Sequence, residues 1–385
     1  MFVYLDNSAT TKPYDEVITK MTEGLKTFGN PSSLHRLGLD AERLLKTSRR
    51  QIASSVNCEE TEIVFTGSGT EADSLAILGT GYALKRRGNK IITSKIEHKA
   101  VLENFALLES QGFEVVYLDV DKQGIIDMAQ LEAELNDKTI LVSVMWVNNE
   151  TGCIQPISQI GKLVHKFENT VFHSDGVQAF GKINIDPRLN EVDLLSISAH
   201  KIHGPKGVGA LYIKKGIRLE PVILGGSQES GLRSGTENIP GILGFSEAAK
   251  LGFSSFDARF KKVKSLKEYF LDGIKAEIND ILINSANIDF TSPYVLNVSF
   301  KGIKGEVLLH MLEQDEIFVS TGSACSSKKK IESHVLKAMG LRSHDIDGAI
   351  RFSFSEFNTI DEIDYTLDKL KNSIKRMRAG TLRRR

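Results

Sequence analysis

The chain has 385 residues, which is too long for one small core, so two domains are the default expectation. Basic and acidic residues balance at 49 each, so no bulk charge attracts nucleic acid or a membrane surface. The three scattered cysteines, Cys58, Cys153 and Cys325, imply no disulfide framework, and no apolar run reaches transmembrane length. We therefore expect a cytoplasmic protein in a reducing compartment, without direct binding to nucleic acid or membrane.

The first two thirds of the chain alternate short β-rich runs with helical stretches. Helices are expected over residues 15–28 and 36–56. Seven strands are expected at residues 62–66, 90–96, 114–120, 139–147, 170–174, 193–199 and 209–213. Strands that alternate with helices are typical of a mainly parallel sheet covered on both faces. The pattern predicts an α/β fold with a seven-stranded, mainly parallel sheet in a large domain over residues 13–255.

The pattern changes after residue 255. A charged helix is expected over residues 256–279, followed by short strands at 281–283, 294–299, 317–320 and 349–353. A last helix starts at Thr359, with Glu362 three residues on as a capping box. Its apolar stripe consists of Ile363, Leu367, Leu370, Ile374 and Met377. We predict a smaller α+β domain made of residues 1–12 and 256–385.

The stretch from Leu194 to Gly207 carries the strongest chemical signal. An apolar run ends in Ser198-Ala199-His200-Lys201, and Gly204 and Pro205 then force a turn. A lysine at the carboxyl end of a buried strand lies where open α/β sheets bind their ligands. Schiff-base formation is one chemistry that needs such a lysine, and a desolvated site helps by lowering its pKa. The simpler alternative is a lysine whose stem covers the sheet edge while its ammonium reaches water.

The loop Thr66-Gly67-Ser68-Gly69-Thr70-Glu71-Ala72 follows a strand and opens a helix, so its backbone amides predict an anion site. It also matches G-x-G-x-x-A, so a nicotinamide enzyme is a competing interpretation. About 60 residues precede this strand, and the next strand ends in Ile96-Glu97-His98 rather than in one acidic residue, which disfavours that interpretation. The loop also lacks the Lys-Ser/Thr pair of a P-loop.

Three further groups bear on the chemistry. Asp175 ends the strand around Thr170-Val171-Phe172, where a buried carboxylate needs a donor or cation unless it merely caps a helix. Asn148-Asn149 ends another apolar strand, and turn chemistry explains the pair only in part. The spacing of His200 and His203 raises the possibility of a metal, but Cys-x-x-Cys and His-Glu-x-x-His are both absent, so we expect no metal site.

Cys325 lies in the polar loop Ser320-Thr321-Gly322-Ser323-Ala324-Cys325, followed by Ser326, Ser327 and three lysines. Most lone cysteines are buried and inert. Gly, Ser and Lys are unusual neighbours for a core residue, and nearby cations favour the thiolate. We predict a reactive thiol on a mobile loop at about residues 320–332, although three close lysines can also mark only a solvated loop.

Together these motifs resemble the cysteine desulfurases, in the class V aminotransferase group of the fold-type I pyridoxal-phosphate enzymes. The resemblance runs from Tyr4-Leu5-Asp6-Asn7-Ser8-Ala9-Thr10-Thr11 to Ile350-Arg351-Phe352-Ser353. Its most specific parts are Ser198-Ala199-His200-Lys201, Arg233-Ser234-Gly235-Thr236 and Gly322-Ser323-Ala324-Cys325. The phosphate loop departs from the usual Ser-Gly-(Gly/Ala)-Thr-Glu, and Ser74 stands where the family commonly has Asn, so the entry to the helix can differ.

The resemblance implies a role for each matching residue. Lys201 would form the Schiff base with pyridoxal 5'-phosphate, Asp175 would hold its ring nitrogen, and His98 would stack on its ring. The other implied cofactor contacts are Gly69, Thr70, Asn149, Gln178, Ser198 and His200, together with Thr236 reaching the neighbouring subunit of a homodimer. Asn30, Asn149 and Arg351 would bind the substrate amino acid, with Arg351 on its carboxylate.

The implied reaction takes sulfur from L-cysteine. Lys201 would move the Cα proton, His98 would act as acid and base, and the Cys325 thiolate would take the sulfur as a persulfide, leaving L-alanine. The acceptor would be an iron–sulfur scaffold protein, a tRNA-thiolation enzyme or a cofactor pathway. Another fold-type I enzyme, such as a selenocysteine lyase or an aminotransferase, is the alternative enzyme, and an inactive sulfur-carrier scaffold is the alternative outside enzymes.

Overall fold

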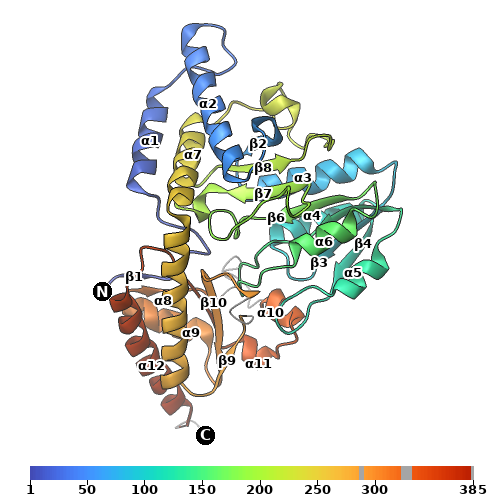
Figure 1. Ribbon diagram of the computed structural model, residues 1–385. Helices are drawn as coiled ribbons and strands as arrows, with labels where there is room; N and C mark the ends of the chain where they lie inside the picture. Colours follow the sequence, from blue (N-terminus) through green and yellow to red (C-terminus); the bar gives the residue numbers. More distant parts are fainter. Residues whose placement is uncertain (286–289, 322–331, 383–385) are drawn as a thin grey trace.

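The computed structural model describes residues 1–285, 290–321 and 332–382, and Figure 1 shows a large α/β part above a smaller part that holds both ends of the chain. The predicted seven-stranded, mainly parallel sheet is confirmed. Its strands follow the order β2-β8-β7-β6-β5-β3-β4, and β8 is antiparallel to both of its neighbours while the other neighbouring pairs are parallel. The strands are β2 (Ile63–Thr66), β3 (Lys90–Ser94), β4 (Glu114–Leu118), β5 (Thr139–Ser143), β6 (Val171–Asp175), β7 (Leu194–Ser198) and β8 (Gly209–Ile213).

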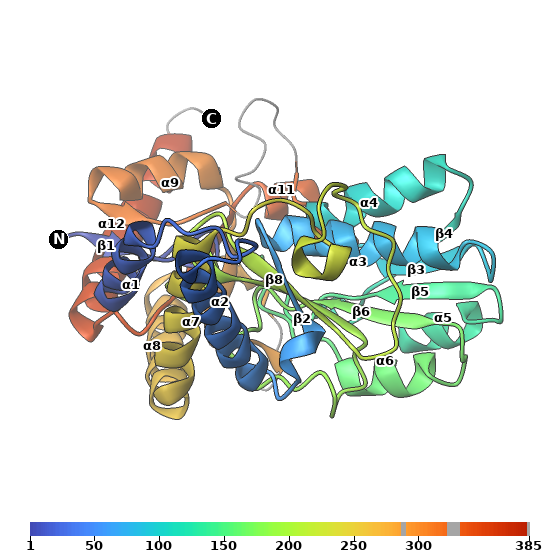
Figure 2. The ribbon, with the colours of Figure 1, turned by 90° about the horizontal axis from the view of Figure 1, so that it is seen from above.

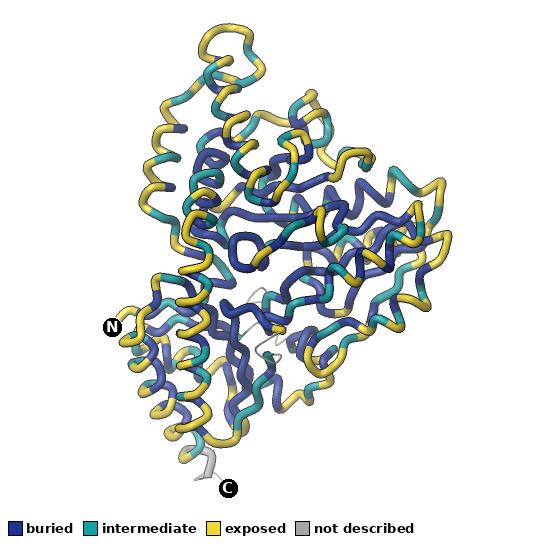
Figure 3. The backbone as a smooth tube through the Cα atoms, viewed as in Figure 1, coloured by how far each residue is buried: buried dark blue, intermediate teal, exposed yellow. Residues whose placement is uncertain are grey.

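Alternation along the strands divides the core of this part into two clusters. On β2, Ile63 and Phe65 enter one apolar cluster and Val64 enters the other, as a side-chain period of two requires. The helices that share a cluster with Phe65 are α1 (Asp15–Lys26), α2 (Arg36–Ser55), α5 (Met128–Glu134), α6 (Ile157–Val164) and α7 (Ile239–Ser254). Those that share one with Val64 are α3 (Gly69–Leu84) and α4 (Lys99–Ser110), and Figure 2 shows them across the sheet from α5 and α6. The sheet is therefore buried on both faces (Figure 3).

The smaller part has its own sheet and core. Strands β9 (Ile281–Ile283), β10 (Val295–Phe300) and β12 (Ala349–Ser353) form an antiparallel sheet in the order β12-β10-β9. The N-terminal β1 (Val3–Tyr4) pairs in parallel with β11 (Ile317–Phe318). The helices are α8 (Phe256–Glu277), α9 (Gly305–Gln314), α10 (His334–Ala338), α11 (Ser343–Ile346) and α12 (Ile360–Leu382). The bounds 13–255 for the large domain and 1–12 plus 256–385 for the small one stay predictions.

The capping box before α12 is confirmed. The backbone N–H of Glu362 donates to Thr359 Oγ1 at 3.2 Å, and the N–H of Thr359 donates to Glu362 Oε2 at 3.1 Å. The predicted apolar stripe of α12 packs into the core of the smaller part, with Ile363 and Leu370 fully buried. No helix among the described residues is long and apolar enough to cross a membrane.

A buried ion pair connects the two parts. Arg259 of α8 donates from Nη1 to Glu356 Oε1 at 3.0 Å and from Nη2 to the carbonyl of Gly181 at 2.9 Å. His203 Nε2 lies 3.3 Å from Glu356 Oε2, and the Tyr14 hydroxyl donates to Glu356 Oε1. Burial alone raises the pKa of the Glu356 carboxyl, but the hydrogen bonds and charges of His203, Arg259 and Tyr14 outweigh it and hold that pKa far below its ordinary value.

We predict that Glu356→Gln lowers the free energy of unfolding by about 3 kcal/mol at neutral pH, because it leaves the buried Arg259 guanidinium without its carboxylate. The Glu356 pKa is depressed in the folded state, so this contribution is present above the pKa of the unfolded chain and is lost as the pH falls through the folded value. Urea unfolding measures the change, and the difference from wild type narrows in acid. Glu268→Gln, which removes the exposed partner of Lys264, is the control and changes stability by less than about 0.5 kcal/mol. Equal effects of the two substitutions would contradict the assignment.

Candidate active site

The residues singled out in the sequence gather at one edge of the large sheet. Lys201 ends the short 3-10 helix η2 (Ala199–Lys201) that follows β7, Asp175 ends β6, and His98 caps the start of α4 just after β3. Because β3, β6 and β7 point the same way, their carboxyl ends meet. Electrostatic interactions also link the three residues. The charge of Asp175 raises the pKa of His98 and that of Lys201 lowers it. The charges of His98 and Lys201 both lower the pKa of Asp175. This is the edge at which open α/β sheets bind ligands.

The Lys201 side chain is held by the N-terminal segment. Its Nζ donates to the carbonyl oxygens of Ser8 at 2.6 Å and Ala9 at 2.8 Å. The Lys201 ammonium therefore lies between the large sheet and the segment that follows β1. Ser8 and Ala9 act here through their backbone, so no side-chain signal in the sequence pointed to them.

Asp175 belongs to a cluster of fully enclosed carboxyl groups. Asp175 Oδ1 accepts a hydrogen bond from the backbone N–H of Val177 at 2.9 Å, and burial raises the pKa of the Asp175 carboxyl. Asp73 of α3 and Glu97 lie in the same electrostatic neighbourhood; burial raises the pKa of Glu97 to about 8 and that of Asp73 well above its ordinary value. His173, 3.6 Å from Asp73, has its pKa lowered by burial to about 3 and is neutral. Burial disfavours the Asp175 carboxylate, while the charges of His98 and Lys201 and the Val177 N–H favour it, and a cation on the ligand would favour it further. Asp73 was not singled out from the sequence, because a lone aspartate inside a predicted helix gives no sign that it is buried near Asp175.

The start of α3 forms a cradle for an anion. Gly69 is its first residue, and a Cβ there would meet Val177 Cγ2 at 2.7 Å and Ser198 Cβ at 3.4 Å, so only glycine fits. The Ser198 hydroxyl is buried and has no hydrogen-bond partner among the described residues. Backbone amides at the N-terminus of a 16-residue helix, with an unpaired hydroxyl beside them, suit a phosphate group. Thr70 follows on the exposed side of this turn, and His200 Nδ1 lies 3.1 Å from Thr10 Oγ1.

Gln178 connects this site to a further lysine. Its Nε2 donates to the Ser8 carbonyl at 2.9 Å, and its Oε1 accepts from Lys182 Nζ at 2.8 Å. The Ser8 carbonyl therefore receives hydrogen bonds from both Gln178 and Lys201.

Arg351 reaches the site from the smaller part. It lies on β12 and donates to the Asn149 carbonyl at 3.0 Å and to Asp6 Oδ1 at 2.8 Å. Its Nε has no partner among the described residues, although the side chain is almost completely buried. One guanidinium N–H is thus enclosed without an acceptor, and such a donor favours an anion beside it.

Two of the expected residues lie on the surface of this single chain. Asn30 is exposed in the loop between α1 and α2, which is at the top of Figure 1, whereas the part that carries Arg351 is at the bottom. Thr236 is exposed between the 3-10 helix η3 (Gln228–Gly231) and α7. The structure gives neither a contact with Lys201 or Arg351, so their predicted roles stay predictions.

Cys325 lies outside the described residues, but both flanks of its segment are described. The Ser320 N–H donates to the Arg351 carbonyl at 3.2 Å, and the Arg351 N–H donates back at 2.6 Å. On the other flank, the Ser333 hydroxyl donates to Glu150, and His334 Nε2 lies 2.9 Å from the carbonyl oxygen of Glu97, next to His98.

The other two cysteines differ from the thiol predicted to react. Cys58 is half-buried and Cys153 is buried, and burial raises the pKa of each thiol to about 12. Both are therefore protonated and unreactive at neutral pH.

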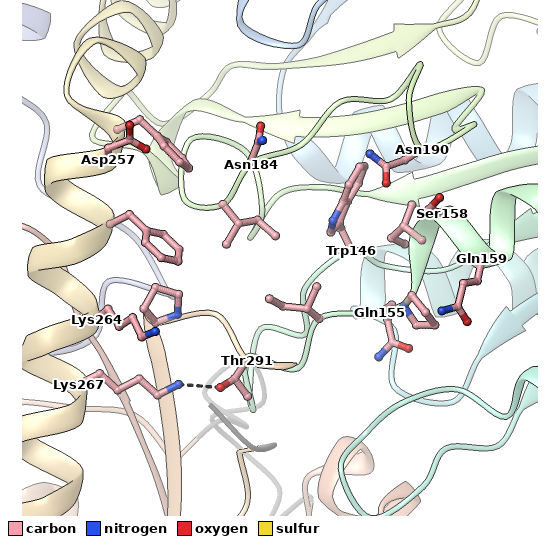
Figure 4. A pocket seen from close by; sticks show the side chains of 17 residues that line it. Trp146, Gln155, Ser158, Gln159, Asn184, Asn190, Asp257, Lys264, Lys267 and Thr291 are labelled. Carbon is pink, nitrogen blue, oxygen red and sulfur yellow. Dashed lines mark hydrogen bonds between the residues drawn. The ribbon is translucent and has the colours of Figure 1, made fainter. Parts of the chain in front are cut away.

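A cavity of about 680 Å³ is a separate feature. It lies between α8 and the loops after β5 and β6, and none of the predicted site residues lines it. Figure 4 shows Lys267 at its edge, where Nζ donates to Thr291 Oγ1 at 3.1 Å and to the Ser292 carbonyl at 2.9 Å. A much smaller cavity, of about 10 Å³, is lined by both Lys201 and Lys182. In the part of the chain that the structure describes, no group of three His, Cys, Asp or Glu side chains could hold a metal ion.

Comparison with known proteins agrees with this geometry. Residues 3–366 match the family described as aminotransferase class-V. The chain is 44% identical to a protein named cysteine desulfurase IscS from Clostridium botulinum, over 98% of this chain and 95% of that one. It is 42% identical to the putative cysteine desulfurase IscS 1 of Bacillus subtilis, over 97% and 99%.

Solved structures are similar over nearly the same length. A NifS-like protein superposes with a TM-score of 0.91 at 38% identity, covering 97% of this chain and 99% of that one. A structure titled SspA in complex with cysteine superposes with a TM-score of 0.82 at 33% identity, covering 93% and 100%. With Lys201, Asp175 and Arg351 gathered at one edge of a seven-stranded sheet, the chain belongs to the class-V aminotransferase family and, within it, to the cysteine desulfurases.

Proposed function

We propose that this chain removes sulfur from L-cysteine with the help of pyridoxal 5'-phosphate, yields L-alanine, and carries the sulfur as a persulfide on Cys325. One observation supports this most: the Lys201 amine at the end of β7 and the enclosed Asp175 at the end of β6 influence each other's charge at one sheet edge. An amine beside a buried carboxylate suits a ligand that has both a carbonyl group and a protonated ring nitrogen.

The residues of the site fit that cofactor. The glycine-lined start of α3 and the unpaired Ser198 hydroxyl suit its phosphate, and Asp175 suits its ring nitrogen because burial leaves that carboxylate in need of a cation. The Gln178 amide N–H points toward the same edge, where it donates to the backbone carbonyl of Ser8. His98, Asn149, His200 and Thr70 complete the proposed contacts, and Thr236 of a second copy is proposed to reach the phosphate.

The chemistry divides between the cofactor and the chain. Pyridoxal phosphate, when bound, supplies an electron sink for charge developing at the substrate Cα. Lys201 moves the Cα proton, and Arg351 binds the substrate carboxylate with the N–H that has no partner in the described chain. Asn149 and Asn30 are proposed to assist in binding the amino acid.

His98 suits acid–base work near the substrate sulfur. Burial and the charges of Lys201 and His334 lower its pKa against the opposing charge of Asp175, which favours the neutral imidazole. Its Nδ1 accepts from the Ala100 N–H at 3.1 Å, while Nε2 has no partner among the described residues. The Cys325 thiolate attacks the substrate sulfur; an S–S bond forms as the C–S bond breaks, and the carbon takes a proton to leave as alanine.

A homodimer completes the proposal. Leu25, Phe28 and Leu34, in and beside the α1–α2 loop, are 72%, 82% and 94% exposed in the single chain. Neighbouring apolar side chains this exposed mark an interface. Asn30 lies in the same loop, so a second copy seated there could bring it toward an active site. A sulfur-acceptor protein and a cytoplasmic location are further parts of the proposal, and an aminotransferase or selenocysteine lyase remains the alternative enzyme.

Lys201→Ala is predicted to abolish the yellow colour of the cofactor-loaded protein and to lower alanine production from L-cysteine by roughly 10³-fold, because it removes both the Schiff-base amine and the base. Visible absorbance and alanine quantification check the two effects. Lys206→Ala, an exposed lysine five residues on, is the matched control and keeps both. A Lys201→Ala protein with wild-type turnover would rule out this mechanism.

Cys325→Ser is predicted to lower cysteine desulfuration by at least about 100-fold and to remove the persulfide from the chain, since no other described thiol is reactive at neutral pH. Mass spectrometry of the protein after incubation with L-cysteine locates the added sulfur. Cys58→Ser is the control and leaves both readouts intact. Full cysteine desulfuration by Cys325→Ser would contradict the persulfide proposal and would favour the aminotransferase alternative.

Sedimentation is predicted to give twice the 42.6 kDa mass of the chain. Leu34→Glu weakens that dimer by roughly tenfold or more, because it places a charge in an apolar contact. Leu189→Glu, at a position that is 77% exposed in another loop, is the control and leaves the dimer unchanged. A monomer at all concentrations would contradict the proposed dimer.

A further inference from the structure

Lys182 is a second lysine beside the active site, and the reaction described above does not use it. It follows β6 by seven residues and is only 5% exposed. Its Nζ donates to Gln178 Oε1 at 2.8 Å, and no carboxylate of the described residues lies within ion-pairing distance. A buried ammonium with only a neutral hydrogen-bond partner is costly, so its presence needs a reason.

Geometry connects Lys182 to Lys201. Both side chains line the same cavity of about 10 Å³, which is about the space of one water molecule. A continuous path also links them, because Gln178 donates to the Ser8 carbonyl that accepts from Lys201. Because the Lys182 ammonium can only donate, the Gln178 atom that it contacts must be the amide oxygen. The Gln178 NH₂ group therefore points toward the Ser8 carbonyl.

The charges around Lys182 make it sensitive to Lys201. Burial, the positive charge of Lys201 and that of Arg351 lower the pKa of Lys182 to about 7, while Glu356 opposes them. Lys182 in turn lowers the pKa of His200, and it lies 5.9 Å from the centre of the Tyr294 ring. Coulomb repulsion is mutual, so a charge on Lys182 must disfavour a charge on Lys201 by the same free energy.

We propose that Lys182 is a positioning residue for the proposed reaction: it orients the Gln178 amide, and its positive charge favours the neutral amine of Lys201. In Schiff-base formation the neutral amine attacks a carbonyl carbon and the carbonyl oxygen leaves as water, so the charged amine is inactive. The Ser8 and Ala9 carbonyls and the charge of Asp175 favour the ammonium of Lys201. A nearby cation offsets that preference. This inference rests on the proposed function, in which Lys201 binds an aldehyde.

The test measures Lys201 itself, with no cofactor bound. The full-length chain is freed of carbonyl compounds with hydroxylamine, then labelled with acetic anhydride across a pH series, and the extent at Lys201 is read by mass spectrometry. Lys182→Met is expected to slow labelling of Lys201 roughly tenfold at pH 6, where Lys182 is charged, and to leave labelling above pH 8, where Lys182 is neutral, nearly unchanged. Lys182→Arg, which stays charged throughout the pH series, is expected to keep the wild-type labelling rate below pH 7 and to lose the departure from a single titration near pH 7.

Lys267→Met is the matched control. Lys267 is also buried, also has only neutral hydrogen-bond partners, and also has its pKa lowered by burial to about 7, but it lies at the separate cavity. Its substitution is expected to leave the labelling of Lys201 unchanged. An unchanged Lys201 profile in Lys182→Met, or an equal shift in Lys267→Met, would overturn the proposal.

Two further readouts keep the proposal testable if Lys182→Met fails to fold. In the wild-type chain, the labelling rate of Lys201 should depart from a single titration near pH 7, where Lys182 loses its charge, and a single-step profile would refute the coupling. In the cofactor-loaded chain, Lys182→Gln is expected to raise the pH midpoint of the visible absorbance change by about one unit. The anhydride experiment needs no cofactor, so failure to bind pyridoxal phosphate would sink the proposed function and leave the coupling of the two lysines measurable.

Discussion

The hydrogen bonds from Lys201 to the carbonyls of Ser8 and Ala9 hold the candidate active site together. They join the end of β7, a strand of the large sheet, to a segment that leads out of the smaller part. Asp6 in the same segment accepts from Arg351, and the Ser353 N–H donates to the carbonyl of Leu5. The Lys201 amine and the Arg351 guanidinium are thus both hydrogen-bonded to the segment of residues 6–9, which limits how far they can separate.

Around that stretch, the site keeps a balance between enclosed acids and enclosed bases. Asp73, Glu97 and Asp175 are carboxyl groups whose pKa burial raises, while burial lowers the pKa of His98, His200 and Lys182. Both shifts favour neutral groups, as expected when a polar site is removed from water. A charged ligand that enters can therefore alter several of these groups at once, which is common at active sites.

Much of this architecture could be predicted from the sequence because it follows local rules. Strands that are buried on both faces appear as apolar runs, and the Thr359–Glu362 capping box is visible in four residues. Lys201 and Asp175 could be found because each directly follows or ends such a run. Lys182 could not, since its role depends on a partner, Gln178, and on a cavity that only the folded chain creates. The predicted phosphate contact of Thr236 depends on a second chain, which a sequence pattern does not place, and Asn30, predicted near the substrate carboxylate, lies on the surface of the single chain.

The described residues on either side of positions 322–331 are attached to different parts of the fold. Ser320 pairs with the backbone of Arg351 on β12, whereas Ser333 donates to Glu150 and His334 Nε2 lies 2.9 Å from the Glu97 carbonyl, both in loops of the large part. The small antiparallel sheet and the large sheet are therefore joined through these two flanks. A hinge motion of one part against the other changes the distance between the two attachment points, so domain motion and the position of Arg351 are mechanically linked.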